Sequence, residues 1–223
     1  MVGRMMMDFG ITLSQLNECL CSIPMFEENI TALKLAHSAG AINFILSDAN
    51  HHYISIILDH HNIASSFKAI ETNLSYVEDE PPPPSVAPDQ QGEGGGRVVL
   101  KRLRISPHQP ADNPHVCALC PENLCKGNVL DQWREQYSFT KVLYVGDGGG
   151  DFCPALRLQA ADVVLCRQNY PLHKKCMAAA RSQQLESHSG SELAESAHHL
   201  AADMVQWSSG TDILSFFQDV FCK

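Results

Sequence analysis

Short apolar runs and helical repeats of apolar residues follow one another along this chain. Apolar residues spaced three and four apart predict amphipathic helices, and short uninterrupted apolar runs predict buried strands. Helices are predicted over residues 12–21, 27–39, 53–61, 128–137, 152–160 and 213–221. Strands are predicted over residues 42–46, 98–105, 141–145 and 163–166. Strands that alternate with helices predict an α/β fold.

A change in composition interrupts this alternation. Residues 81–84 are all proline, and residues 92–96 are glycine apart from Glu93. Such a stretch cannot bury a core, so we predict a disordered loop over residues 79–97. The run that follows, residues 98–105, alternates apolar and basic residues, which is typical of an exposed or edge strand.

Size and charge narrow the class of protein. The chain has 223 residues, of which 44% are hydrophobic, which is enough for one α/β domain with a small second module. Its net charge is −9, and its basic residues cluster only over residues 97–104. Nucleic-acid binders usually carry a basic stripe, so we expect a small molecule rather than nucleic acid as the partner. The sequence does not indicate an oligomeric state.

Cysteine usage and the amino-terminal residues indicate a cellular compartment. The nine cysteines are odd in number and scattered along the chain. Residues 1–10 include Arg4 and Asp8 within their apolar stretch, unlike a secretory signal. No run reaches the roughly 18 apolar residues of a membrane span. We therefore expect a cytoplasmic protein with reduced thiols and no membrane partner.

Two aspartates follow the strand predicted over residues 141–145. Only glycines separate Asp147 from Asp151, and α/β proteins bind ligands where their parallel strands end. Magnesium takes carboxylate oxygens, water and substrate phosphate as ligands, and glycine lets the backbone approach them closely. The two aspartates are therefore a candidate magnesium site. In the alternative interpretation, Asp151 only caps the next helix.

Two further segments carry candidate phosphate-binding residues. Ser47, Asp48 and Asn50 follow the strand predicted over residues 42–46, where a hydroxyl and helix-start N–H groups can bind a phosphate oxygen. The alternative is a simple helix cap. Lys126 lies just before a predicted helix, where its charge opposes the helix dipole unless an anion lies beside it. The alternative there is a solvated loop lysine.

These residues occur in an order that resembles the haloacid-dehalogenase (HAD) superfamily of phosphatases. The stretches that carry the resemblance are SIPMFEENITALKLAHSAG, FILSDANHHYISIILDH, CALCPENLCKGNVL and YVGDGGGDFCP, within about residues 5–177. They are similar to the eukaryotic branch with phosphoethanolamine/phosphocholine phosphatase, pyridoxal-phosphate phosphatase and plant thiamine-phosphate phosphatase-like proteins. The resemblance implies a HAD-like Rossmannoid parallel sheet in a core over residues 31–223 and a partial helical cap over residues 1–30.

The resemblance also implies an activity and a role for each candidate residue. The activity is magnesium-dependent hydrolysis of small phosphorylated metabolites: phosphoethanolamine, phosphocholine, pyridoxal phosphate, thiamine monophosphate or pyrophosphate. An aspartate forms an aspartyl-phosphate that water hydrolyses, while the metal and a lysine stabilise the charged transition state. The implied roles are phosphoryl binding by Ser47, charge neutralisation by Lys126, magnesium ligation by Asp147, ligation or water orientation by Asp151, and lining of the site by Asp48 and Asn50.

The nucleophile motif of this superfamily, DxDxT, is not found in the chain. Its one candidate starts at Asp8, and Gly10 stands where the second aspartate should be. The resemblance therefore implies that the nucleophilic aspartate and the first, central strand are missing, as in a truncated chain. We expect this chain alone to have little or no turnover.

Two other interpretations remain open. In the first, the chain is an inactive remnant that still binds phosphate or metal. In the second, Cys117, Cys120 and Cys125, with His108 and His115 upstream, form a small zinc-binding module, since zinc takes four cysteine or histidine ligands. A cysteine-phosphatase mechanism is disfavoured because no cysteine is followed by an arginine six residues later.

Overall fold

A computed structural model of the protein describes Met6 and residues 9–80, 100–189 and 198–222. Asp8 and nearly all of the predicted loop at 79–97 lie outside the described residues. The contacts divide the chain into two units, and each is described by itself. The first comprises Met1–Met25 and Ile42–His108, and the second comprises Phe26–Ala41 and Gln109–Lys223.

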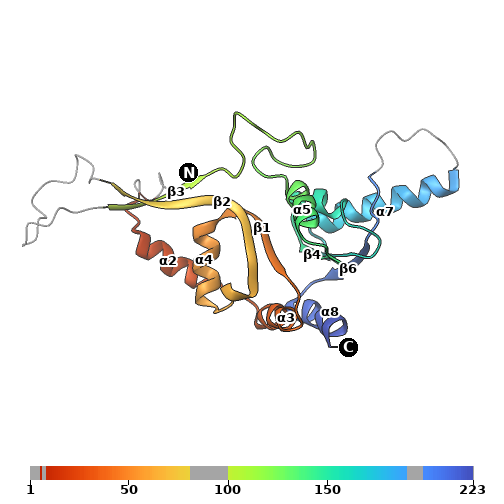
Figure 1. Cartoon of the computed structure of the whole chain (residues 1–223), viewed down its shortest axis with the longest axis horizontal. Helices are drawn as coiled ribbons and strands as arrows, with labels where there is room; N and C mark the ends of the chain where they lie inside the picture. Colours follow the sequence, from red (N-terminus) through yellow and green to blue (C-terminus); the bar gives the residue numbers. More distant parts are fainter. Residues whose placement is uncertain (1–5, 7–8, 81–99, 190–197, 223) are drawn as a thin grey trace, which may run out of the picture. The chain divides into compact units, whose positions relative to one another are not determined.

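The first unit contains a three-stranded mixed sheet with the strand order β1-β2-β3 (Figure 1). Its strands are β1 (Asn43–Asn50), β2 (Phe67–Glu80) and β3 (Leu100–Ser106). β1 runs parallel to β2, and β2 runs antiparallel to β3. Parallel neighbours need a crossover connection, which here is α4 (His51–His60) and a 3-10 turn (Ala64–Ser66). Another helix, α2 (Leu13–Cys21), packs against α4.

The edge strand β3 and the central strand β2 of this sheet differ in how well local patterns predict them. The edge strand predicted over residues 98–105 is confirmed as β3. The long strand β2 was not predicted, because charged residues such as Lys68, Glu71 and Glu78 interrupt its apolar positions. Its structure comes from pairing: residues 74–80 pair one by one with residues 100–106.

The second unit is built on three parallel strands in the order β4-β5-β6. They are β4 (Leu143–Gly146), β5 (Val163–Arg167) and β6 (Asp203–Trp207). Residues 163–166 of the central strand are buried, as expected for an uninterrupted apolar run inside a parallel sheet. β6 was not predicted, because its apolar residues are few and a polar residue interrupts them.

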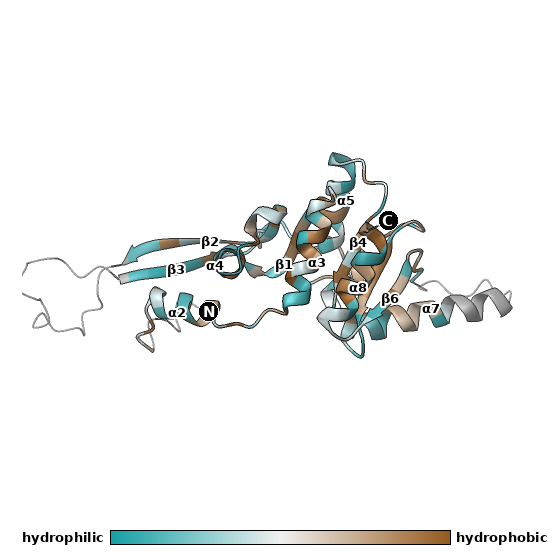
Figure 2. Cartoon of the chain, turned by 90° about the horizontal axis from the view of Figure 1, so that it is seen from below, coloured by the Kyte–Doolittle hydropathy of each residue, from teal (hydrophilic) through white to brown (hydrophobic). Residues whose placement is uncertain are grey.

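Helices cover both faces of this second sheet (Figure 1). They are α3 (Glu27–Ser38), α5 (Lys126–Gln136), α6 (Phe152–Ala155), α7 (Pro171–Ser189) and α8 (Gly210–Phe221). Val164 and Cys166 of β5 pack with α5, α6 and α7, whereas Val163 and Leu165 pack with α3 and α8. Successive strand residues point to opposite faces, so one strand contributes to two cores. Figure 2 shows hydrophobic residues on β4 and α8 and more polar ones on the described part of α7.

The prediction of an α/β fold with parallel strands is confirmed. Ser47 lies on β1, an edge strand of the first sheet, and Asp147 follows β4, an edge strand of the second. Within the described ranges, these two strands belong to separate sheets. Among the same residues, no helix combines the length and the apolar composition needed to cross a membrane.

Candidate functional site

A buried carboxylate, that of Asp151, lies in the loop that follows β4. Its Oδ1 atom accepts hydrogen bonds from Nζ of Lys126 at 2.8 Å and from the hydroxyl of Tyr144 at 2.9 Å. Its Oδ2 atom accepts hydrogen bonds from the backbone N–H groups of Asp147 at 3.2 Å and Gly148 at 2.9 Å. Donors therefore surround both oxygens of a carboxylate that is nearly removed from water.

The loop is shaped so that this carboxylate folds back onto the residues before it. A 3-10 turn (Gly149–Asp151) leads into α6, and Asp151 makes no side-chain capping bond to that helix. Asp151 is therefore more than a cap of the next helix. A Cβ atom at Gly146 would lie 2.8 Å from Oδ2 of Asp151. Only glycine at position 146 therefore leaves room for the carboxylate of Asp151.

Lys126 is held by this carboxylate. It is the first residue of α5, and Cys125 is the N-cap. A positive charge at a helix N-terminus opposes the helix dipole, and Asp151 is the anion that compensates it. The side chains of Lys126 and Asp151 are 12% and 9% exposed. Lys126 is thus not a solvated loop lysine.

Asp147 differs from Asp151 in being half exposed. Its side chain is 48% exposed, and its Oδ2 atom lies 3.7 Å from Nη1 of Arg167. The guanidinium of Arg167 lies 4.2 Å from the ring centroid of Tyr170 and 5.2 Å from that of Trp207. Sequence analysis missed Arg167, although it ends β5 at the sheet edge where Asp147 follows β4. The structure thus gathers two carboxylates and two cations around one loop.

The three residues predicted near the end of β1 lie in the first unit and have other partners. The hydroxyl of Ser47 accepts a hydrogen bond from the N–H of Ala49 at 3.2 Å. Asn50 is the N-cap of α4, and its Oδ1 atom accepts a hydrogen bond from the N–H of Tyr53 at 3.0 Å. The helix-cap interpretation therefore holds for Asn50. Asp48 is exposed. A place for these residues beside the loop of the second unit stays a prediction.

Four cysteine thiols gather near the same loop of the second unit. Their sulfur atoms all lie within 4.8 Å of one another, and they belong to Cys117, Cys120, Cys125 and Cys153. Burial acts to raise the pKa of Cys117, but hydrogen bonds from the Leu119 N–H and from neighbouring thiols lower that pKa to about 7. Burial raises the pKa of Cys153 to about 11. Sequence analysis missed Cys153, which lies outside the CxxC segment.

The chain is similar to known phosphatases. Residues 1–221 match the sequence model of the Putative Phosphatase family. The chain is 39% identical over 183 residues to a thiamine phosphate phosphatase-like protein of Arabidopsis thaliana. This aligned region covers 78% of the chain and 66% of the relative. It is 36% identical over 182 residues to inorganic pyrophosphatase 2 of the same organism, covering 77% and 57%. It is 28% identical over 224 residues to a pyridoxal phosphate phosphatase of Mus musculus, covering 97% and 77%. No solved structure matches the chain.

The match to the plant relatives is partial in length. The chain spans about half to two thirds of their length. The family match nevertheless covers nearly every residue of the chain, and the relatives are phosphatases of the predicted branch. The predicted resemblance is confirmed: the chain belongs to the Putative Phosphatase family, a branch of the HAD phosphatases.

Proposed function

We propose that this protein is a phosphatase that hydrolyses small phosphate monoesters with the help of a magnesium ion. The observation that carries the proposal is the nearly buried pair of Lys126 and Asp151 beside the half-exposed Asp147. These groups lie where β4 ends, at the sheet edge where α/β proteins bind ligands. Membership of a phosphatase family supports the same activity.

The carboxylates of this loop fit a magnesium ion. Magnesium typically takes one or two carboxylates together with water and phosphate oxygens, and the exposed carboxylate of Asp147 offers such a ligand. Asp151 already accepts hydrogen bonds on both oxygens. We therefore assign Asp151 to holding Lys126 and the loop backbone, and Asp147 to binding the ion. When bound, magnesium supplies positive charge to the phosphate oxygens.

The charges of the loop support a role for a bound cation there. Asp147 and Asp151 carry two negative charges, which Lys126 and Arg167 offset. Without a metal ion, a phosphate dianion would approach a site with no excess positive charge. Lys126, held 2.8 Å from Asp151, would neutralise charge on the phosphoryl group as the ester bond breaks.

The remaining assignments rest on the family resemblance. Ser47 would bind the transferring phosphoryl group, and Asp48 and Asn50 would line the same loop. Because the DxDxT motif is not found and Gly10 stands where its second aspartate, the general acid/base, should be, we expect the 223-residue chain alone to have little or no turnover. None of the nine cysteines forms a disulfide, which agrees with our proposal of a cytoplasmic protein.

The relatives define the substrates to test. Their names refer to thiamine phosphate, inorganic pyrophosphate, pyridoxal phosphate, and phosphoethanolamine or phosphocholine. The first experiment measures phosphate release from each compound by the purified chain with and without magnesium. The same samples are titrated with magnesium and with phosphate by calorimetry. We expect magnesium binding that Asp147→Asn abolishes, with turnover near background.

A second protein separates the phosphatase proposal from the missing nucleophile. It carries an added amino-terminal segment with an apolar strand and the DxDxT motif. Magnesium-dependent turnover in this extended protein alone would support both parts of the proposal. Robust turnover by the 223-residue chain would show that the chain has its own nucleophile. If the extended protein binds magnesium and phosphate but hydrolyses nothing, the chain is an inactive binding remnant.

A further inference from the structure

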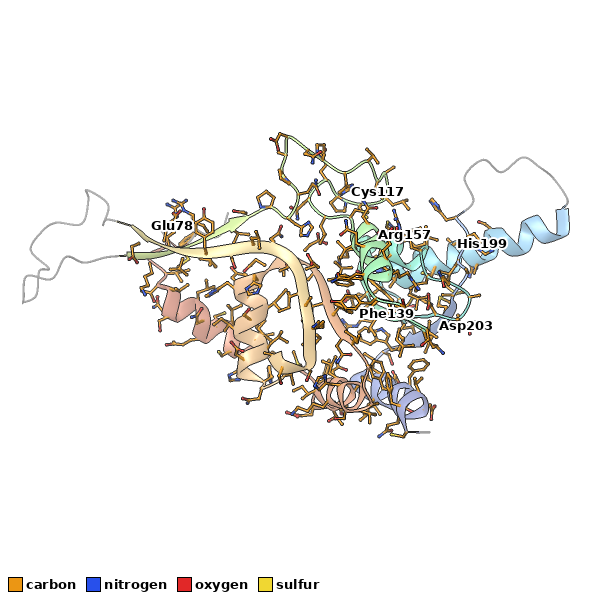
Figure 3. All side chains as sticks on the ribbon, viewed as in Figure 1. Glu78, Cys117, Phe139, Arg157, His199 and Asp203 are labelled. Carbon is orange, nitrogen blue, oxygen red and sulfur yellow. The ribbon has the colours of Figure 1, made fainter. Side chains whose placement is uncertain are left out.

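Four thiols from three separate places in the second unit converge on one point. Cys117 and Cys120 lie in the segment before α5, Cys125 is the N-cap of α5, and Cys153 lies in α6. The Sγ atom of Cys153 lies 3.6 Å from that of Cys117 and 3.8 Å from that of Cys125. All four sulfur atoms lie within 4.8 Å of one another. Figure 3 labels Cys117 in this segment.

These separations fit a tetrahedral metal ion. Zinc–thiolate bonds are about 2.3 Å long, so the sulfurs of a tetrahedral four-thiolate site lie about 3.8 Å apart. A disulfide instead requires sulfurs about 2.05 Å apart. The two measured pairs lie close to the tetrahedral value. The arrangement therefore has the spacing of a metal centre rather than that of bonded pairs.

The segment that carries two of the thiols also needs an anchor. Residues 107–125 contain no helix or strand, and loops of this length without regular structure are uncommon in compact domains. Val116 is fully exposed, whereas Leu124 and Cys125 are buried. The buried end of the segment is thus held by packing, whereas most residues at 111–118 are exposed. A metal ion bound to Cys117 and Cys120 would supply that link.

We propose that one zinc ion is bound as a closed structural site by four thiolates, those of Cys117, Cys120, Cys125 and Cys153. The thiols lose their protons to solvent as the ion binds. Zinc is favoured because four thiolates in a tetrahedral arrangement are typical of structural zinc and leave no open position for substrate. The proposal is independent of the phosphatase activity, because it concerns another metal and another set of ligands.

The histidines near this segment have other partners. His115 contacts the carbonyl of Pro121 through Nε2 at 2.7 Å and accepts the N–H of Cys117 through Nδ1 at 3.3 Å. Nε2 of His108 lies 3.3 Å from Glu71 in the first unit. The fourth ligand is instead Cys153, which lies 28 residues beyond Cys125. In the proposed site, Cys153 thus takes the place of the histidines considered in the sequence analysis.

A cation lies beside the proposed site. A Cβ atom at Gly127 would lie 2.5 Å from Nε of Arg157 and 2.6 Å from Sγ of Cys153. The guanidinium and the thiol therefore meet at the same surface of α5, and Arg157 is further held by an ion pair with Asp131. A zinc ion with four thiolates carries a net negative charge, which this guanidinium offsets. Groups that surround a metal site in this way tune its affinity.

The site would connect the two elements that hold the candidate active-site pair. Cys125 directly precedes Lys126, and Cys153 follows Asp151 by two residues. A metal ion bound to both cysteines would fix the start of α5 against the start of α6. This would set the distance between Lys126 and Asp151 without touching substrate.

The test measures metal rather than activity. The chain is produced in zinc-containing medium and purified under reducing conditions. Its zinc content is then measured by inductively coupled plasma mass spectrometry. We expect about one zinc per chain, and cobalt substitution should give the strong thiolate charge-transfer and d–d absorption of a tetrahedral site. Cys117→Ser and Cys153→Ser should each lose most of the zinc and this cobalt spectrum. Cys176→Ser is the matched control, because Cys176 is also buried and pairs with Cys166 at 3.9 Å.

Two results would overturn the proposal. The first is a reduced, folded chain with well under one zinc that shows no tetrahedral cobalt spectrum on titration. The second is zinc that persists unchanged in both Cys117→Ser and Cys153→Ser. Circular dichroism confirms that each protein is folded. The cobalt titration of the unaltered chain tests the four-thiolate site even if a variant fails to fold.

Discussion

The Nζ atom of Lys126 lies 2.8 Å from the Oδ1 atom of Asp151, and water reaches little of either side chain. Lys126 begins α5, whereas Asp151 ends the turn after β4. One ion pair thus connects the first turn of a helix to the loop at a strand end. Since a buried charge is costly when its partner is removed, the geometry of this loop and the stability of the unit depend on each other.

Replacing this lysine should destabilise the protein strongly. In Lys126→Met the carboxylate of Asp151 stays buried without its cation, so we expect the free energy of unfolding to fall by about 3 kcal/mol. Urea unfolding followed by circular dichroism measures the change. Lys34→Met, at an exposed lysine of α3, is the control and should change stability little.

The double variant separates the ion pair from the packing of the lysine side chain. Lys126→Met combined with Asp151→Asn leaves no unpaired charge, so its loss of stability should be smaller than the sum of the two single losses. Additive losses would show that the two side chains act independently.

The glycine before Asp147 should not tolerate a methyl group. In Gly146→Ala the new Cβ atom would lie 2.8 Å from Oδ2 of Asp151, so the carboxylate must move and the unfolding free energy should fall by about 1–3 kcal/mol. Gly149→Ala is the matched control in the same loop, because its Cβ atom would find the nearest heavy atom 3.7 Å away. Equal stability of the two variants would contradict the close contact at Gly146.

Asp147 should matter for magnesium and little for stability. Its carboxylate is exposed and only 3.7 Å from Arg167, and such an ion pair contributes at most about 1 kcal/mol. Calorimetric titration of Asp147→Asn should therefore show loss of magnesium binding with nearly unchanged unfolding. Asp203→Asn is the control, because this exposed aspartate lies at the opposite, amino-terminal end of β6, the other edge strand of the same sheet. Normal magnesium affinity in Asp147→Asn would remove Asp147 from the proposed site.

The start of α8 should lose its cap in acid. Hydrogen bonds from the Ser208 N–H and hydroxyl, and then from Ser209, lower the pKa of Asp212 from 3.8 to about 2. A carboxyl with a depressed pKa stabilises the fold above its ordinary value, and this contribution is lost as the pH falls from about 4 towards 2. An NMR titration should locate the transition near pH 2. Asp212→Asn should make the stability difference between pH 5 and pH 3 smaller, and an unchanged difference would contradict this role.

Local patterns predicted those elements whose own sequence contains an apolar run or a helical repeat of apolar residues. The apolar run of β5 is buried as a single segment, and the helical spacing of Leu13, Leu16 and Leu20 predicted α2. β2 could not be predicted in this way, because its charged residues follow no apolar repeat. Its structure depends on pairing with residues that lie beyond the segment at 81–99, and a local pattern holds no information on such a partner.

The candidate site likewise has features that the local sequence predicts and features that only the fold reveals. The position of Asp147 and Asp151 after an apolar strand predicted their place at a sheet edge. For Lys126, the helix start left two interpretations open, an anion beside it or a solvated loop lysine, and the structure supports the first. That this anion is Asp151 depends on how two segments 25 residues apart pack. The contribution of Tyr144 depends on how the loop after β4 folds back onto its own strand. The fourth thiol, Cys153, is likewise known only from the fold.

The strand β5 also determines how the second unit can unfold. Val163 and Leu165 belong to the core under α3 and α8, while Val164 and Cys166 belong to the core under α5, α6 and α7. If β5 shifted by one residue relative to β4, its residues would point to the opposite faces of the sheet. Packing in both cores therefore favours the same register between the two strands. Displacement of this strand would therefore disrupt both cores together. The two halves of the unit should consequently open as one cooperative element, and the strand ends that carry Asp147 and Arg167 share the protection of the whole.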